Sequence, residues 1–241
     1  MIVNLPKYRI SYSLIPFKRN QDLIKIKNFT NKIIFSASVI DGWNNLDEIK
    51  GNVPGKRVAS FVAENFPKIF TSLQDTNIQR MAEKTAKIVD EKVLKLYPAH
   101  ASCVGAFLFH YSDRNIIVAV GSIFVYIWSG KSWKKLKEIG DYSLDPSIYP
   151  SDVSCFFGRG ELKKQDPDLY KVNPDTILIP TKTPIFIGTD GTEEFISIKD
   201  LNELTNKVGF DYSEKFISSL NDLASSRKSS QNDDASIFVK F

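Results

Sequence analysis

Cysteine and histidine are scarce in this sequence of 241 residues, which contains two of each. Cys103 and Cys155 lie in apolar stretches and form no Cys-x-x-Cys pair, so we expect buried thiols in a reducing compartment. The sequence contains no Gly-x-Ser-x-Gly string. With so few ligands and bases, a zinc site and a Ser-His or Cys-His nucleophile are both excluded as the main hypothesis. His110 lies in an apolar run and is expected to be a packed core histidine.

Long apolar runs and a dominant charge are also missing. The longest apolar run, residues 116–128, is shorter than the roughly 20 residues that span a bilayer. The 32 basic and 28 acidic residues are interspersed and leave a net charge of +4. This pattern favours solubility and does not indicate a surface that binds nucleic acid. No charged-then-apolar signal opens the sequence. We therefore expect a cytoplasmic protein, most simply a monomer, that binds neither nucleic acid nor membrane.

Hydrophobic periodicity predicts an α+β chain without internal repeats or a dividing linker. Helical spacing is expected at residues 55–73, where Pro67 suggests a kink or an early end, and at 75–97, 192–204 and 212–224. Strands are expected at residues 9–14, 23–27, 32–40, 103–111, 115–120, 123–128, 133–139, 184–189 and 235–241. Residues 141–180 are expected to be loops with short strands. This order suits sheets sandwiched between helices in one domain, residues 1–241.

Carboxylates stand at the ends of several predicted strands. Asp41-Gly42 and Asp190-Gly191 each follow an apolar run, and Asp233-Asp234 introduces the last strand. Each Asp-Gly can be a simple turn, because Gly accepts positive φ and Asp bonds its own backbone. A carboxylate at the end of a buried strand, however, needs a cation or hydrogen bonds. If these ends converge, they predict a carboxylate site for Mg²⁺ or Mn²⁺, whose bound water would favour hydrolysis of phosphate esters.

Four short strings resemble, in order and spacing, the successive signatures of the metal-dependent, type 2C (PPM) serine/threonine protein phosphatases. They are Asn20-Gln21-Asp22, Ile40-Asp41-Gly42, Thr189-Asp190-Gly191 and Asn232-Asp233-Asp234-Ala235-Ser236. The resemblance covers nearly the whole chain. It implies a four-layer α-β-β-α sandwich of two antiparallel sheets flanked by helices, with two Mg²⁺ or Mn²⁺ ions at one end and a phosphorylated protein as substrate.

The resemblance also implies roles for individual residues. Asp41 would bridge both metals, the Gly42 carbonyl would bind one of them, and Asp190 and Asp233 would bind the other. Asp22 would hold metal-bound waters. A hydroxide bridging the metals would then attack the phosphorus of a phosphoserine or phosphothreonine in line, without a phosphoenzyme.

Two departures from the family pattern precede Asp22. Gln21 stands where the family has Glu, which removes one charge beside the metal waters. Phe17 stands where the family has a phosphate-binding Arg, so Lys18 or Arg19 would have to contact the phosphate instead.

Three further departures follow the Asp-Gly strings. Trp43 stands where some members have a His proposed as general acid, which would leave protonation of the leaving group to water. Ser122 and Glu194 each stand where the family has an Asp, so a third metal should be weak or absent.

Three interpretations of the sequence remain open. The retained carboxylates Asp41, Asp190 and Asp233 favour an active phosphatase, because their burial without cations would be costly. The altered neighbours favour a catalytically weak or inactive pseudophosphatase that acts as a binding or regulatory module. The third is a sheet-rich domain whose Asp-Gly pairs are only turns.

Overall fold

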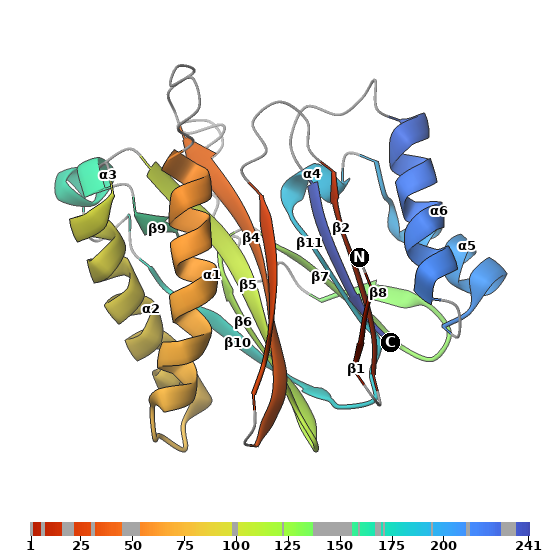
Figure 1. Ribbon diagram of the computed structural model, residues 1–241, viewed down its shortest axis with the longest axis horizontal. Helices are drawn as coiled ribbons and strands as arrows, with labels where there is room; N and C mark the ends of the chain where they lie inside the picture. Colours follow the sequence, from red (N-terminus) through yellow and green to blue (C-terminus); the bar gives the residue numbers. More distant parts are fainter. Residues whose placement is uncertain are drawn as a thin grey trace.

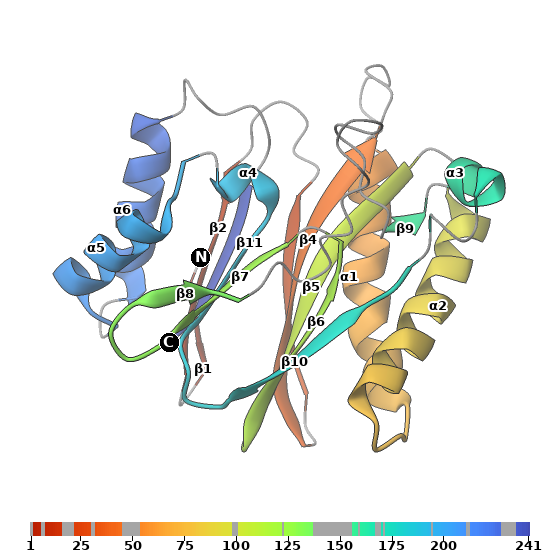
Figure 2. The same ribbon diagram turned by 180° about the vertical axis from the view of Figure 1, so that it is seen from behind.

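Two antiparallel sheets face each other and carry helices on their outer faces (Figure 1), an arrangement equally visible from behind (Figure 2). The fold is therefore the α+β, four-layer α-β-β-α sandwich that the resemblance implies. The computed structural model describes residues 2–5, 8–15, 22–29, 32–44, 54–97, 101–121, 123–136, 156–158, 160–166, 170, 172–193, 195–210, 213–227 and 235–241.

The first sheet has the strand order β10-β6-β5-β4-β3, with the short β9 paired to β5. Its strands are β3 (Leu23–Asn28), β4 (Ile33–Asn44), β5 (Ala101–Tyr111), β6 (Arg114–Val120), β9 (Phe157–Gly158) and β10 (Asp175–Pro180). Helices α1 (Pro54–Ser72) and α2 (Ile78–Leu96) cover its outer face, and α3 (Gly160–Gln165) lies beside one end of α2 (Figure 1).

The second sheet has the order β1-β2-β12-β11-β7-β8. Its strands are β1 (Ile2–Leu5), β2 (Tyr8–Ile15), β7 (Phe124–Trp128), β8 (Trp133–Lys135), β11 (Ile185–Gly188) and β12 (Ala235–Lys240). Helices α5 (Ile198–Val208) and α6 (Ser213–Ser226) cover its outer face, and the short α4 (Asp190–Glu193) stands at the end of β11 (Figure 1).

Alternation along the strands divides the apolar residues among three layers of core. In β4, Phe35, Ala37 and Val39 face the space between the sheets, whereas Ile40 faces the helices α1 and α2. The helix-side layer is tightly packed, since the ring of Phe66 in α1 stacks on Phe107 of β5 with 3.9 Å between centroids. A third layer lies under α5 and α6. The side-chain parity of each strand therefore fixes which residues meet between the sheets.

The helix predicted over residues 55–73 is confirmed as α1, and it continues past Pro67 to Ser72, so the proline does not end it early. Other predicted boundaries were wrong. The helix predicted over residues 192–204 is two elements, α4 and α5, because Ser197 forms a capping box with Asp200 and starts a new helix. Residues 141–180 include the helix α3, which the sequence analysis did not anticipate, and β1 was also missed. The strand predicted to reach residue 139 ends at Lys135.

The described helices offer no candidate for a membrane span, since none of them is both long and apolar enough.

Candidate metal and phosphate site

The Asp41-Gly42 dipeptide is not a turn. Strand β4 continues to Asn44, and Asp41 and Gly42 pair with Val104 and Cys103 of β5 in an antiparallel ladder whose register is regular from Phe35 to Asn44. The prediction that this strand ends at Asp41 was therefore wrong, and so was the turn interpretation at this position. By the alternation of β4, Asp41 follows Val39 on the face that looks toward the other sheet. The half-buried carboxyl group thus lies near the end of β4, at the edge of the inter-sheet space that is uppermost in Figure 1 and is called the upper edge below.

Asp22 lies beside Asp41 at the same edge. In the antiparallel pair of β3 and β4, Leu23 is opposite Ile40, and extending that register by one residue sets Asp22 opposite Asp41. Ile24 faces the inter-sheet core, so by alternation Asp22 does too. Asp22 is only 4% exposed. A carboxyl group this deeply buried needs polar partners.

One of those partners is Thr189, which reaches Asp22 from the opposite sheet. The Thr189 hydroxyl donates to Asp22 Oδ2 at 2.8 Å and accepts from the backbone N–H of Ser236 at 2.9 Å. Thr189 N–H in turn donates to the Ser236 carbonyl at 3.1 Å. These bonds connect β3, β11 and β12, and they place the residue before Asp190 next to the strand that follows Asp233. These bonds bring together residues from three of the four signature strings, and Asp41, opposite Asp22, adds the fourth.

Asp190 does not form a hairpin turn either. It begins α4, its Oδ1 accepts from the Gly191 N–H at 2.8 Å, and its side chain is exposed at the upper end of β11. The close approach of α4 to the sheet needs Gly188, since a Cβ there would meet Thr192 Oγ1 at 2.9 Å. The Thr192 hydroxyl donates to the Ser236 carbonyl at 3.3 Å and so ties α4 to β12.

Glu193, the last residue of α4, supports this site through contacts that the sequence analysis did not identify. Its carboxylate accepts from the Tyr126 hydroxyl and pairs with Lys135 Nζ at 3.0 Å. The Lys135 ammonium lies 4.2 Å from the ring centroid of Phe124. The hairpin of β7 and β8 therefore holds the last residue of α4 and with it the helical turn that carries Asp190. No local motif marks Glu193, because its partners are about 60 residues away in the chain.

The remaining predicted site residues divide into two groups. Gly42 and Trp43 lie within β4, buried and half-buried respectively, with Trp43 opposite Ser102. The others lie outside the described residues, and their predicted roles stay predictions: Phe17, Lys18, Arg19, Gln21, Ser122, Glu194 and Asp233.

Oxygen donors dominate the described part of the site, and this fits Mg²⁺ or Mn²⁺ with their waters. The described residues alone contain no group of three His, Cys, Asp or Glu side chains that could hold a metal ion. The third predicted carboxylate, Asp233, lies outside them. Ser236 Oγ is buried and has no hydrogen-bond partner among the described residues. This hydroxyl can therefore bind a water molecule or a ligand beside the converging strings.

The scarce thiol and imidazole groups behave as structural residues. Burial raises the pKa of the Cys103 thiol well above its usual range, and the nearby Asp41 charge raises that pKa further. His110 is fully buried, stacks on Phe35 and places Nδ1 2.6 Å from Asn115 Oδ1. Burial lowers its pKa to about 4. The prediction of a packed core histidine is confirmed, and the prediction of a buried thiol is confirmed for Cys103; Cys155 lies outside the described residues.

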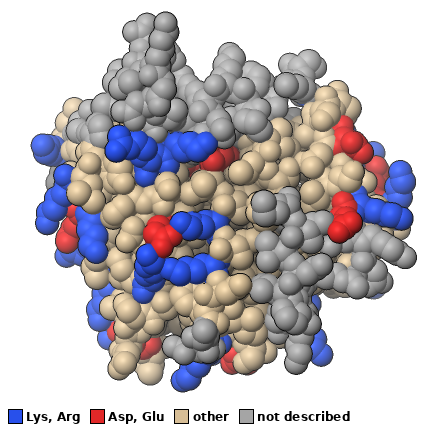
Figure 3. All heavy atoms as spheres, viewed as in Figure 1, with Lys and Arg blue, Asp and Glu red and all other residues tan. Residues whose placement is uncertain are grey.

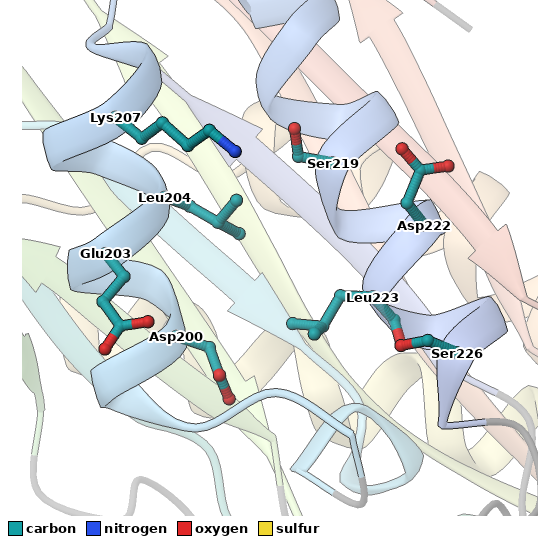
Figure 4. Close-up of a pocket in the computed structure, with 8 residues that line it drawn as sticks. All are labelled: Asp200, Glu203, Leu204, Lys207, Ser219, Asp222, Leu223 and Ser226. Atoms are coloured by element: carbon teal, nitrogen blue, oxygen red, sulfur yellow. The ribbon is translucent and has the colours of Figure 1, made fainter.

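A groove between α5 and α6 lies away from these strand ends. Figure 4 shows Leu204 and Leu223 facing each other across it, with carboxylates on both helices. The Arg227 guanidinium donates to both carboxylate oxygens of Asp200, at 2.9 Å to Oδ2 and 3.1 Å to Oδ1. These hydrogen bonds lower the pKa of the Asp200 carboxyl group to about 2. The groove brings together none of the signature strings, so we do not assign the main activity to it.

Comparison with solved structures identifies the fold. A bacterial serine phosphatase superposes with a TM-score of 0.71 at 13% identity, covering 96% of each chain. The serine/threonine phosphatase of S. agalactiae gives 0.69 at 15% identity, covering 96% of this chain and 99% of that one. A sex-determining protein of C. elegans gives 0.71 at 12% identity, covering 99% of this chain and 66% of that one.

The protein therefore has the fold of the type 2C serine/threonine phosphatases, as the resemblance implies. Neither a family model nor a curated protein matches the sequence. At 12–15% identity the structural likeness establishes the fold alone.

Proposed function

We propose that this protein is a metal-dependent serine/threonine protein phosphatase that hydrolyses phosphoserine or phosphothreonine in proteins. The observation that carries the proposal is the hydrogen-bonded junction of Asp22, Thr189 and Ser236 at the same edge as Asp41. It joins segments more than 160 residues apart in the chain, within a fold shared with serine/threonine phosphatases. A simple sheet-rich domain would not require a buried carboxyl group at this junction.

The site residues take the following roles in this proposal. Asp41, the Gly42 carbonyl, Asp190 and Asp233 would hold two Mg²⁺ or Mn²⁺ ions. When bound, these ions would supply a nucleophilic water at neutral pH and neutralise the phosphate oxygens. Asp22, fixed by Thr189, would orient water molecules by accepting their hydrogen bonds.

Other residues would shape the grip on the phosphate ester. Lys18 or Arg19 would contact the phosphate, Gln21 would act as a neutral neighbour of Asp22, and Glu194 would be too poor a ligand for a tight third metal. Trp43 has no titratable proton near neutral pH, so bulk water would protonate the leaving group.

A binding module without catalytic activity is the second candidate. Its specific support is Trp43, which follows Gly42 within β4 and brings a half-buried indole ring next to the predicted metal ligands. In that case the same edge would bind a phosphoprotein without turnover.

Hydrolysis of an aryl phosphate separates these candidates. We expect turnover with millimolar Mn²⁺ that chelation abolishes, and a loss of about 100-fold or more in kcat/KM for Asp190→Asn. Asp113→Asn is the matched control, since Asp113 is an exposed carboxylate in the turn between β5 and β6 at the other end of the sandwich. Wild-type turnover no higher than background in Mn²⁺ would reject the phosphatase and leave the binding module.

A further inference from the structure

Basic residues are concentrated on the surface formed by α1 and β3. The described charged residues of these two elements are five cations, Lys25, Lys27, Lys56, Arg57 and Lys68, and one anion, Glu64. The whole chain, by contrast, is nearly balanced, with 32 basic and 28 acidic residues. Figure 3 shows basic side chains gathered on this face, one group of them around an acidic side chain. We call these six residues the α1–β3 basic surface.

Glu64 organises the lysines without cancelling their charge. Its carboxylate pairs with Lys25 and Lys68 and lies 3.6 Å from Lys27 Nζ. Hydrogen bonds from Lys25 and Lys68 lower the pKa of Glu64 to about 2, so it stays ionised at neutral pH. Three lysines against one carboxylate leave two surplus positive charges. The lysine side chains remain between 31% and 50% exposed, within reach of a ligand from solution.

The start of α1 extends this positive surface toward the site. Lys56 and Arg57 lie in the first turn of the helix, which contains no acidic residue. The helix macrodipole favours acidic residues there, so these cations work against helix stability. Helix α1 begins at the same end of the sandwich as the end of β4 (Figure 1). Because Lys56 and Arg57 are unfavourable for the start of a helix and lie at the same end as the candidate metal and phosphate site, we infer that they serve a function there.

The spacing along β3 relates the lysines to Asp22. Asp22 directly precedes β3, and Lys25 and Lys27 follow it by three and five residues. At roughly 3.3 Å per residue, these lysines stand about 10 and about 17 Å from Asp22 along the strand. Lys25 and Lys27 lie on the α1 side of β3, opposite to Asp22, and β3 is the edge strand of its sheet. An extended peptide has nearly the same rise, so a substrate that passes from the site around this edge would bring residues three to five positions from the phosphorylated residue near these lysines.

We propose that the α1–β3 basic surface binds an acidic segment of the phosphoprotein substrate, with Asp or Glu three to five residues from the phosphorylated residue. This inference rests on the proposed phosphatase function and adds the substrate class to it. Lys25, Lys27 and Lys68 contact the acidic side chains, while Lys56 and Arg57 raise the positive potential at the entrance to the site.

The test compares phosphoserine peptides that differ only at positions three to five from the phosphoserine, with Glu on one side, Glu on the other side, or Ala throughout. We expect kcat/KM for one Glu peptide to exceed that for the Ala peptide by about tenfold at low salt, and the difference to shrink in 0.5 M salt. Lys25→Gln/Lys27→Gln should reduce the ratio to about twofold or less. Lys25→Arg/Lys27→Arg should retain the ratio, because the charges remain.

Lys199→Gln is the matched control, since Lys199 is an 84% exposed lysine on α5, on the other side of the molecule. A ratio near one in the wild-type protein, or a ratio that Lys25→Gln/Lys27→Gln does not change, would overturn the inference. Tighter binding of a DNA duplex than of the Glu peptide would overturn it as well.

Aryl phosphate turnover keeps the two proposals apart. If the protein hydrolyses aryl phosphate but does not prefer the Glu peptides, the phosphatase stands and the inference fails. If it hydrolyses nothing, fluorescence anisotropy of the labelled peptides decides the inference alone, and the Glu peptide should still bind more tightly than the Ala peptide.

Discussion

Replacement of Thr189 by Val tests the hydrogen-bonded junction of the candidate site. The substitution keeps the shape of the side chain but removes the hydroxyl that donates to Asp22 Oδ2 at 2.8 Å and accepts from Ser236 N–H at 2.9 Å. Both bonds are buried. A buried group that loses its partner costs about 1–3 kcal/mol, so two lost bonds should lower the free energy of unfolding by about 2–6 kcal/mol.

Thermal and urea unfolding measure this loss. In a protein of this size, 1 kcal/mol shifts Tm by about 2–4 °C, so we expect Thr189→Val to melt roughly 4–24 °C below the wild type. Thr189→Ser keeps the hydroxyl and should lose less. Thr71→Val serves as the control, because the Thr71 hydroxyl bonds back to Lys68 O within α1 on an exposed face. A Thr189→Val protein as stable as the Thr71→Val protein would refute the junction.

Two further predictions concern stability away from the site. The pKa of His110 is lowered from 6.5 to about 4, so between these pH values the unfolded chain binds more protons than the folded one. The contribution of the neutral His110 to the free energy of unfolding should be fully present above pH 6.5 and fall by about 3 kcal/mol as the pH drops to 4. Urea unfolding of His110→Gln should show a weaker fall with pH, and an equal fall would contradict this reasoning. Lys163→Met removes one partner of a buried ion pair in which Lys163 Nζ lies 2.8 Å from Asp90 Oδ1, and it should lower the free energy of unfolding by about 3–5 kcal/mol. Lys199→Met, in the exposed pair with Glu203, should lower it by less than about 1 kcal/mol, and equal losses in the two variants would contradict this contrast.

The fold was largely predictable because its strands and helices carry clear periodicity. Phe35, Ala37 and Val39 alternate along β4, and α1 repeats apolar residues at helical spacing. The errors occur where a local signal competes with tertiary contacts. Pro67 has the local signature of a helix end, yet it is buried in the packed face of α1 and the helix continues.

The Asp-Gly strings show the same limit at the candidate site. Gly42 has the local signature of a turn, but Cys103 pairs with it across a ladder that continues to Asn44. The convergence of Asp22, Thr189 and Ser236 depends on the parity of three strands from two sheets, which no single string specifies. Glu193 could not be predicted, because its contacts with Tyr126 and Lys135 arise only when β7 and β8 pack beside α4.

Anomalous diffraction at the manganese edge, from crystals grown with Mn²⁺, is the most direct test of the proposed site. Our account predicts two strong peaks at the upper edge of the sandwich, within bonding distance of Asp41 and Asp190. Their loss in crystals of Asp41→Asn, with Asp113→Asn unchanged, would complete the assignment. Crystals that contain Mn²⁺ in solution but show no anomalous peak beside Asp41 would contradict it.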